Sequence, residues 1–533
     1  MNEKMNEAIN QITDRHLAEA VNYRKRHYGY WVAAAAAILA LVLCLTLVGK
    51  EPGKQNVNMD VPTVGLTPTL PAPTTPVAPM DPMPTTMPPT MPSTPPAEQD
   101  PEVPRQMFNP MEGLELPDLL ASPLLPTMMR YPNYDDFEDD YRAYREAVAQ
   151  WQDDQKAFYN QPDGYADSLT DFFTASITQF LSGDKNSTYS PVNVYLAMAM
   201  LAETTDGDSR QQILDLFGLE SIEDLRTQAK HLWNAHYSND GFTTLLLGNS
   251  LWLDDAFGFN QETVERLEAE YFASTFHGDL GTDASNAQLH SWLNAMTGGL
   301  LEDQAKNVEL SPNATFALAS TVYFQASWAD KFPEIYTHEG IFHGITGDTS
   351  ATYMQTYVTD RIFHGSNFSA VRLALSGNND MWIILPDAGV DVATVLAGEE
   401  YLRLTLDPAS WSDYTYARIH LTLPKFDVTS QCDLINGMKN MGVYDIFDSS
   451  LASFDPMITY NPMDGKPYIS QINHAARVKI DEEGVEAAAF TIIEAATDSV
   501  PPEPQDFVVD RPFIFIVSSR DQLPLFAGTV ILP

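Results

Sequence analysis

Apolar and polar positions along residues 165–533 follow helical periodicity first and strand-like patterns later. One predicted helix has an apolar face made of Leu169, Phe172, Phe173, Ile177 and Phe180. Similar spacing predicts further helices near residues 191–204, 209–217, 222–235, 261–271 and 284–299. Runs rich in β-branched and aromatic residues predict strands at residues 243–253, 315–326, 370–385, 417–428, 475–481 and 512–531. Because most helices precede most strands, the pattern indicates an α+β fold.

A second amphipathic pattern lies just before this region, at residues 134–159. Its apolar residues are spaced by three, four or seven positions, and they are Phe137, Tyr141, Tyr144, Val148, Trp151 and Phe158. The first turn is acidic, which complements the helix dipole. We therefore expect a helical segment over residues 131–162. It either docks on the domain that follows or associates with a second copy of the chain.

The N-terminal residues change from basic to apolar in a way that indicates a membrane anchor. Residues 1–29 are polar and contain a basic cluster at residues 24–27, and residues 30–48 are nineteen consecutive residues without a charge. Such a run is long enough to cross a bilayer, and the basic side is expected in the cytoplasm. We expect a cytoplasmic tail over residues 1–29, a single transmembrane helix over residues 30–49 and an extracellular remainder. A cleaved signal peptide is the alternative, although no A-x-A site follows.

Residues 50–130 are expected to form a linker rich in Pro, Thr and Met. The part at residues 51–110 holds 17 of the 37 prolines of the chain. Such a composition favours extended polyproline II conformation over a packed core. We expect a stalk that separates the globular domain from the membrane.

Charge and cysteine content limit the range of partners and cross-links. The formal net charge is -42, from 72 acidic and 30 basic residues. This charge repels phosphate backbones, so nucleic acid is not an expected partner. The two cysteines are Cys44, inside the apolar run, and Cys432 in the globular region. No disulfide within the globular domain is therefore expected.

Short motifs of common catalytic sites are missing from the sequence. We find no G-x-S-x-G, G-x-G-x-x-G, phosphate-binding P-loop or H-E-x-x-H pattern. Eleven histidines are scattered, and His338 and His343 are five positions apart, which does not suit two metal ligands on one helical face. We expect no enzyme activity, no metal site and no cofactor.

The segment at residues 478–502 has the most ambiguous pattern in the chain. The residues just before Asp481 alternate and are β-branched, which predicts a strand, while Pro501 and Pro502 end regular structure. Between them, alanine and glutamate favour a helix, whereas Val485 and the residues around it favour a strand. An ordinary surface loop is the simplest interpretation, and a segment with two conformations is the alternative.

Several stretches, in order, resemble the serpin family of protease inhibitors. Residues 482–489 (EEGVEAAA) resemble the hinge of the reactive-centre loop in inhibitory members. Residues 189–201 (YSPVNVYLAMAML), 322–332 (VYFQASWADKF) and 512–533 (PFIFIVSSRDQLPLFAGTVILP) resemble further segments. The resemblance covers residues 163–533. It implies a serpin fold with a large sheet A, sheets B and C, about nine helices and an exposed reactive-centre loop.

The resemblance implies a suicide-substrate mechanism rather than catalysis by this chain. In the family, a protease attacks the loop and forms an acyl-enzyme, and the cleaved loop inserts into sheet A as a strand. The implied hinge residues are Glu482, Gly484, Val485, Glu486, Ala487, Ala488 and Ala489. Alternate hinge residues from Val485 onward are uncharged and mostly small, as an inserting strand requires. We expect an inhibitor of serine proteases, with cysteine proteases as a second target class. A non-inhibitory binding protein and a structural surface protein are the alternatives.

The family register also implies the bond that the protease attacks. The scissile carbonyl belongs to the residue fourteen positions after the hinge Gly484, which is Asp498 here, followed by Ser499. An aspartate suits a protease with a basic specificity pocket. Cleavage after Thr497 or Ala496 is the alternative, and it would suit an elastase-like or subtilisin-like protease.

Seven further residues are implied as supports of sheet A. They are Ser190, Asn193, Ser320 and His474 at the shutter, and Trp328, Lys425 and Glu482 at the breach. The family usually has Asn where Ser320 stands, so we expect a changed shutter network. For each of these residues, plain packing is the alternative.

Overall fold

The computed structural model describes residues 110–111, 114–122, 132, 137, 140–239, 243–463, 465–485 and 504–533. The contacts divide the chain into Met1–Pro95 and Pro96–Pro533, and every described residue belongs to the second unit. The predicted tail and transmembrane span lie outside the described residues. Within the described residues, no helix has both the length and the apolar character needed to cross a membrane.

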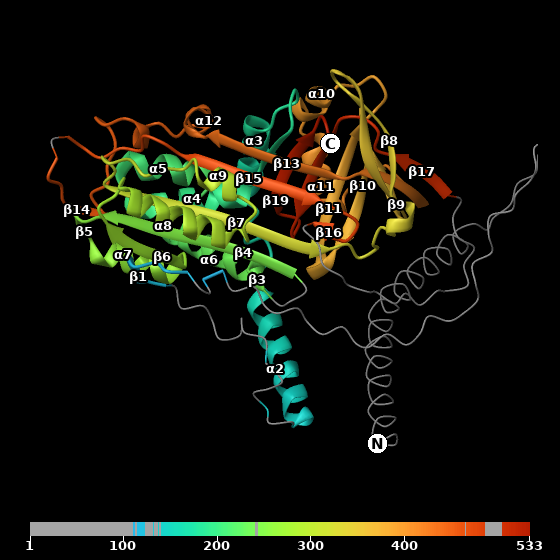
Figure 1. The fold of residues 1–533 in the computed structure, drawn as a ribbon. Coiled ribbons are helices and arrows are strands. Elements are labelled where there is room, and N and C mark those ends of the chain that lie inside the picture. Colours follow the sequence, from blue (N-terminus) through green and yellow to red (C-terminus); the bar gives the residue numbers. More distant parts are fainter. Residues whose placement is uncertain are drawn as a thin grey trace, which may run out of the picture. The chain divides into compact units, whose positions relative to one another are not determined.

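One eight-stranded sheet corresponds to the predicted sheet A (Figure 1). Its strand order is β1 (Leu119–Ala121), β6 (Ala273–Gly278), β4 (Thr243–Asp254), β7 (Phe316–Ser327), β16 (Gly484–Val485), β15 (Asn473–Ile480) and β13 (Phe426–Asp433), with β3 (Ser238–Asn239) on β4. Every residue of β4 is buried. Residues 245–247 and 251–253 are apolar without polar alternation, because a strand covered on both faces needs none.

A nine-stranded sheet contains the strands expected for sheets B and C. Its order is β17 (Pro504–Val508), β12 (Tyr414–Pro424), β9 (Gly347–His364), β10 (Phe368–Leu375), β11 (Asn379–Pro386), β18 (Phe513–Ser518), β19 (Pro524–Val530) and β2 (Ser187–Tyr189), with β8 (His338–Gly344) on β9. Strand β9 is 18 residues long and belongs to both the sheet B region and the sheet C region. Hydrogen bonding therefore joins these two regions into one sheet. A separate pair consists of β5 (Gly258–Phe259) and β14 (Ile458–Tyr460).

Helices of the domain are α3 (Leu169–Phe180), α4 (Pro191–Thr204), α5 (Gly207–Leu216), α6 (Ile222–His236), α7 (Gln261–Glu270), α8 (Asp283–Met296), α9 (Glu302–Ala305), α10 (Val392–Ala397), α11 (Glu400–Leu406) and α12 (Ile435–Asn440). With α2 (Tyr141–Tyr159), the described residues contain about 11 α-helices instead of the expected nine. The count rises because α2 precedes the domain and because α9 is a single turn of four residues. Side-chain caps start several of these helices, such as Ser221 at α6 and Thr282 at α8.

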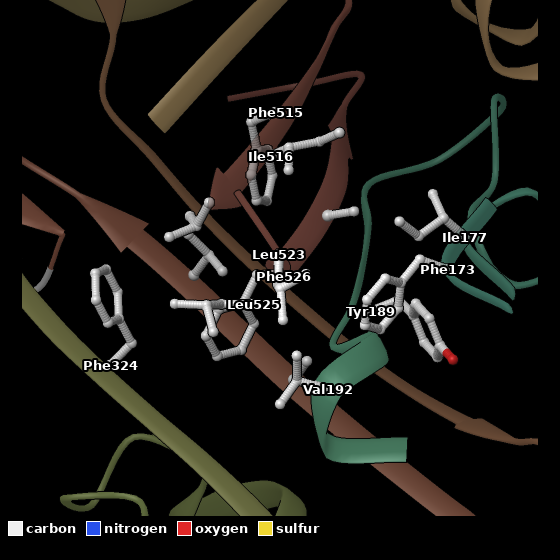
Figure 2. Packing of buried hydrophobic residues seen from close by; sticks show 14 of the residues in the cluster. Phe173, Ile177, Tyr189, Val192, Phe324, Phe515, Ile516, Leu523, Leu525 and Phe526 are labelled. Atoms are coloured by element: carbon white, nitrogen blue, oxygen red, sulfur yellow. The ribbon is translucent and has the colours of Figure 1, made fainter. Parts of the chain in front are cut away.

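Helix α4 lies at the centre of the fold and is buried along almost its whole length. Every residue except Ala197 is buried, and the Ser190 side chain caps its first turn. Val192 of α4, Phe324 of β7 and Phe526 of β19 belong to one hydrophobic cluster, shown in Figure 2. This helix therefore couples sheet A to the second sheet.

Helix α2 begins at Tyr141, later than the stripe of apolar residues predicts. The Asp140 carboxylate accepts hydrogen bonds from two backbone N–H groups of the first turn, which fixes the start of the helix. At the other end, Phe158 packs edge-on against Trp233 at 6.4 Å, and the Arg520 guanidinium lies 4.0 Å above the Tyr159 ring. The C-terminal turn of α2 thus docks on the domain, in agreement with the first of the two predicted roles.

Strand β1 was not predicted and lies inside the stretch expected to be a linker. It extends sheet A, since Leu119 lies opposite Phe276 of β6. The Asp118 backbone N–H donates to Gln288 Oε1 of α8 at 3.0 Å, and the His277 N–H donates to the Asp118 carbonyl at 3.1 Å. Leu119 also packs on a second hydrophobic cluster that includes Trp292. Residues before the domain therefore contribute to its sheet and core.

Leu119→Asp is expected to lower the free energy of unfolding by about 1–2 kcal/mol, because a half-buried apolar side chain is replaced by a charge. Leu120→Asp is the matched control, since Leu120 is 60% exposed on the neighbouring position of the same strand. Thermal and urea unfolding of the two variants measure the difference. Equal transitions in both would mean that β1 does not contribute to the stability of the domain.

Candidate functional site

The hinge segment begins as a strand between two strands of sheet A. Val485 of β16 lies opposite Ile480 of β15 on one side and Ala326 of β7 on the other. Gly484 lies opposite Ser327 of β7, and Val485 is only 4% exposed. Val485 is thus already paired on both sides, and Gly484 is paired with β7. Glu486, Ala487, Ala488 and Ala489 lie outside the described residues.

Gly484 is required at its position by a close approach of backbone. A Cβ atom at this residue would lie 2.2 Å from the Ala326 carbonyl oxygen and 2.7 Å from the Ser327 Cα atom. Neither neighbour is the flexible end of a side chain, so any larger residue would push the hinge away from β7. The glycine that marks the hinge in the sequence therefore has a steric reason.

The breach residues surround the turn that precedes β16. Trp328 is 1% exposed, and its backbone N–H donates to the Glu483 carbonyl at 3.0 Å. Its indole Nε1 donates to the Asp481 carbonyl at 2.8 Å, and the Phe332 N–H donates to the Glu482 carbonyl at 3.2 Å. Trp328 thus holds the turn through two backbone carbonyls in addition to packing.

Glu482 is the charged centre of this turn. Its Oε1 atom lies 2.6 Å from Lys425 Nζ and accepts a hydrogen bond from Thr337 Oγ1 at 2.6 Å. Partial burial alone would raise the pKa of the carboxyl group, but the hydrogen bonds from Lys425 and Thr337 outweigh it and lower the pKa. The predicted pairing of Lys425 with Glu482 is present. Thr337 was missed, because no local pattern relates it to a turn so distant in the sequence.

The shutter residues form one hydrogen-bonded chain beneath sheet A. The Ser190 backbone N–H donates to His474 Nε2 at 3.1 Å, and Ser190 Oγ donates to the Leu525 carbonyl at 2.7 Å. The Asn193 N–H donates to Ser190 Oγ at 3.4 Å, and Asn193 Nδ2 donates to Ser320 Oγ at 3.3 Å. The chain of contacts therefore links β15 to β7 through the start of α4. Ser320 takes part through its hydroxyl group.

A cavity of about 670 Å³ lies along the same line, beside residues 316–322 of β7 and 473–475 of β15. Its walls include Asn193, Leu293, Leu318, Ser320, His474 and Ala475. Within the described residues, no ladder of hydrogen bonds joins β7 directly to β15; β16 lies between them. Sheet A therefore has a strand position between β7 and β15, of which the described residues fill only one end.

The reactive-bond residues Thr497, Asp498 and Ser499 lie outside the described residues. The chain resumes at Pro504 in strand β17, which pairs in parallel with β12. The 18 residues between Val485 and Pro504 thus connect a strand of sheet A to an edge of the other sheet. A connection between two different sheets is the arrangement that a reactive-centre loop requires.

A sequence model described as "Serpin (serine protease inhibitor)" matches residues 168–533. The chain belongs to the serpin family. Serpin-Z2B of Triticum aestivum is 27% identical over 365 residues, which cover 65% of this chain and 90% of the relative. Serpin-ZX of Arabidopsis thaliana is 24% identical over 371 residues, covering 66% and 93%. Serpins are typically protease inhibitors, not catalysts, which agrees with the expectation that this chain is no enzyme.

Solved serpin structures share the fold. The native state of the thermophilic serpin tengpin superposes with a TM-score of 0.62 at 22% identity, covering 70% of this chain and 95% of tengpin. AtSerpin1 of Arabidopsis in its native stressed conformation gives a TM-score of 0.60 at 23% identity, covering 69% and 98%. At such identities the likeness concerns the fold alone.

His474 makes the shutter sensitive to acid. Burial lowers its pKa from 6.5 to about 4, and its Nε2 atom must stay unprotonated to accept the Ser190 N–H. Because the histidine pKa is lower in the folded chain, the unfolded chain binds more protons than the folded chain between pH 6.5 and 4. Stability is therefore lost as the pH falls through this window. His236, whose pKa burial lowers to about 3, acts in the same direction.

We expect the free energy of unfolding to fall by on the order of 3 kcal/mol from pH 6.5 to pH 4 through His474 alone. His474→Gln keeps a hydrogen-bond acceptor without the titration, so it should flatten this slope. His338→Gln, at an exposed position, is the control. Urea unfolding across the pH range measures the slopes, and an unchanged slope in His474→Gln would contradict the assignment.

Proposed function

We propose that this serpin is inhibitory and traps a target serine protease as a covalent acyl-enzyme. The proposal is supported above all by β16, because Val485 pairs with both β7 and β15, and Gly484 pairs with β7. After cleavage of the loop, the residues that follow Val485 would extend this strand. The protease, still bound to the cleaved end, would be carried along sheet A.

The driving force for insertion is the completion of sheet A. Each added residue can pair with backbone groups on both β7 and β15, and unpaired strand edges are otherwise costly when buried. Alternate side chains from Val485 onward, including Ala487 and Ala489, are uncharged and suit the buried face. The cavity beside β7 and β15 would give apolar contacts along the insertion path.

Specificity is proposed to reside at Asp498, with Ser499 on the other side of the scissile bond. An aspartate loses hydration when it enters a protease pocket, so the pocket has to supply a cation or several hydrogen-bond donors. We therefore propose an acid-specific serine protease as the first target class, with a caspase-like cysteine protease as the second. Cleavage after Thr497 would instead point to an elastase-like or subtilisin-like target.

We further propose that residues 30–49 anchor the protein in a membrane and that the domain is extracellular. The uncharged run and the basic residues before it support this topology. Residues 50–130 would then act as a stalk that separates the inhibitor from the membrane surface.

Loop cleavage should identify the target class. Incubation with acid-specific and elastase-like proteases is expected to give a complex that survives SDS, together with a released peptide that begins at Ser499. Asp498→Ala should lower the rate of trapping of the acid-specific protease at least tenfold, because the charged contact in its pocket is lost. Gel analysis and mass spectrometry measure both. A peptide that begins at Asp498 would move the reactive residue to Thr497.

Ala487→Arg is expected to abolish trapping while the loop is still cleaved, because strand alternation from Val485 puts residue 487 on the buried face once the loop inserts. Its charge could not enter sheet A without a loss of several kcal/mol. Glu486→Arg is the matched control, since strand alternation puts residue 486 on the opposite face. The measured quantity is the ratio of covalent complex to cleaved inhibitor. Cleavage without trapping in the unmodified chain as well would favour a non-inhibitory binding protein.

A further inference from the structure

A group of aromatic and basic side chains near the end of the reactive loop has no role in the trapping mechanism. We call it the tyrosine–arginine face, and it consists of Tyr357, Arg361, Tyr414, Tyr416, Arg418 and His420. These residues alternate along β9 and β12, and the register pairs Tyr416 with Arg361 and His420 with Tyr357. Alternate residues of paired strands share one face of the sheet, so all six lie on the same side.

Stacking holds this face in a defined arrangement. The Arg361 guanidinium lies 4.4 Å from the centre of the Tyr414 ring, and that of Arg418 lies 4.5 Å from the Tyr357 ring. Tyr357 stacks on His420 with ring centres 4.7 Å apart. The tyrosines are nevertheless exposed, with Tyr357 at 48% and Tyr416 at 59%. The rings thus orient the cations, which reduces the entropy that a partner's contacts would cost.

The charge of the face contrasts with that of the chain. Acidic residues outnumber basic ones by 72 to 30. About half of the lysines and arginines in the described residues have a carboxylate oxygen within 4.0 Å, as Arg226 has in Glu203 and Arg477 in Asp427. Among the described residues, neither Arg361 nor Arg418 has a carboxylate oxygen within 4.0 Å; on this face, only His420 is paired, with Asp506. Within the part of the chain that the structure describes, these two guanidinium groups thus have no carboxylate partner.

The position of the face relates it to the reactive loop. Strand β17 follows the loop directly and pairs with β12, with Pro504 opposite Arg418 and Asp506 opposite His420. Asp498 precedes Pro504 by six residues, which can span at most about 20 Å. A protease domain has a radius of gyration of about 18 Å. A protease bound at the proposed scissile bond would therefore reach the tyrosine–arginine face.

We propose that the tyrosine–arginine face is a second docking surface for the target protease, and that it binds acidic side chains next to the protease's active-site cleft. The inference rests on the proposed function, since it assumes that a protease engages the loop. Tyrosine and arginine are the residue types most enriched where protein interfaces bind strongly. A guanidinium stacked on a ring keeps its N–H groups free to bind a carboxylate in bidentate geometry. The loop would then determine which bond is cleaved, and the tyrosine–arginine face would determine which protease binds.

The test compares two double variants of the full chain that remove the same charge. R361Q/R418Q alters the face, and R145Q/R403Q removes two exposed arginines elsewhere, on α2 and α11. The rate constant for loop cleavage and that for complex formation are measured with an acidic and a basic protease of the same specificity. We expect R361Q/R418Q to slow both rates about tenfold with the acidic protease, with little change for the basic one. High salt should remove most of the difference in rate between R361Q/R418Q and the unmodified chain with the acidic protease.

Several outcomes separate this inference from the proposed function. A peptide of residues 486–505 lacks the tyrosine–arginine face. The acidic protease should therefore cleave this peptide no faster than the basic protease does. If the unmodified chain forms no covalent complex, the inhibitory function fails, but the cleavage rate still reports docking. Equal cleavage rates for R361Q/R418Q and the unmodified chain would overturn the second docking surface. An equal loss in R145Q/R403Q would overturn it too, because net charge alone would then explain the effect. Faster cleavage of R361Q/R418Q would also overturn the second docking surface, because it would mean that acidic residues of this chain cover the face.

Discussion

Sheet A depends on a strand position between β7 and β15 that the described residues fill at one end only. There, Val485 pairs with both neighbours and Gly484 pairs with β7. The cavity continues this position towards the shutter. Backbone groups along such a position gain hydrogen bonds when a strand enters, and apolar side chains gain contacts. A sheet built in this way stores free energy that local rearrangement of one segment can release.

Two sets of contacts lie at the two ends of the strand position between β7 and β15. At the breach, Trp328 and Glu482 bind the turn through backbone carbonyls and an ion pair with Lys425. At the shutter, Ser190 and His474 join β15 to α4 through neutral hydrogen bonds. The first set is partly exposed and charged, whereas the second is buried and depends on an unprotonated histidine. Acid therefore acts on the shutter through His474, whereas the hydrogen bonds from Lys425 and Thr337 lower the pKa of Glu482 and favour its charged form.

The sequence predicted the regular elements well where the pattern was local. Helix α4 has the predicted bounds, and β4 and β7 differ from prediction by about one residue at their ends. The run at residues 370–385 proved to be two strands, because Gly377 adopts a positive φ of 71° in a tight turn between them. Strands β1, β2, β6, β8, β9 and β17 were missed, among them the 18 residues of β9. β8 has many exposed residues and shows no clear alternation, and β1 forms only through a distant partner strand. In the site, the hinge and the breach pair were predicted through family resemblance, whereas Thr337 and the tyrosine–arginine face depend on contacts across the fold.

In the proposed mechanism, recognition and the energy of loop insertion depend on different residues. Recognition would depend on side chains of the loop and, by inference, of β9 and β12. The energy would depend on β7, β15 and the hinge. Because the two sets share no residue, substitutions in one set should leave the other largely unchanged, as is usual for distant sites. The loop sequence can therefore change from one target class to another while Gly484, Trp328 and the shutter stay fixed. For the same reason, the hinge is a better guide to whether this chain inhibits than the residue at the scissile bond.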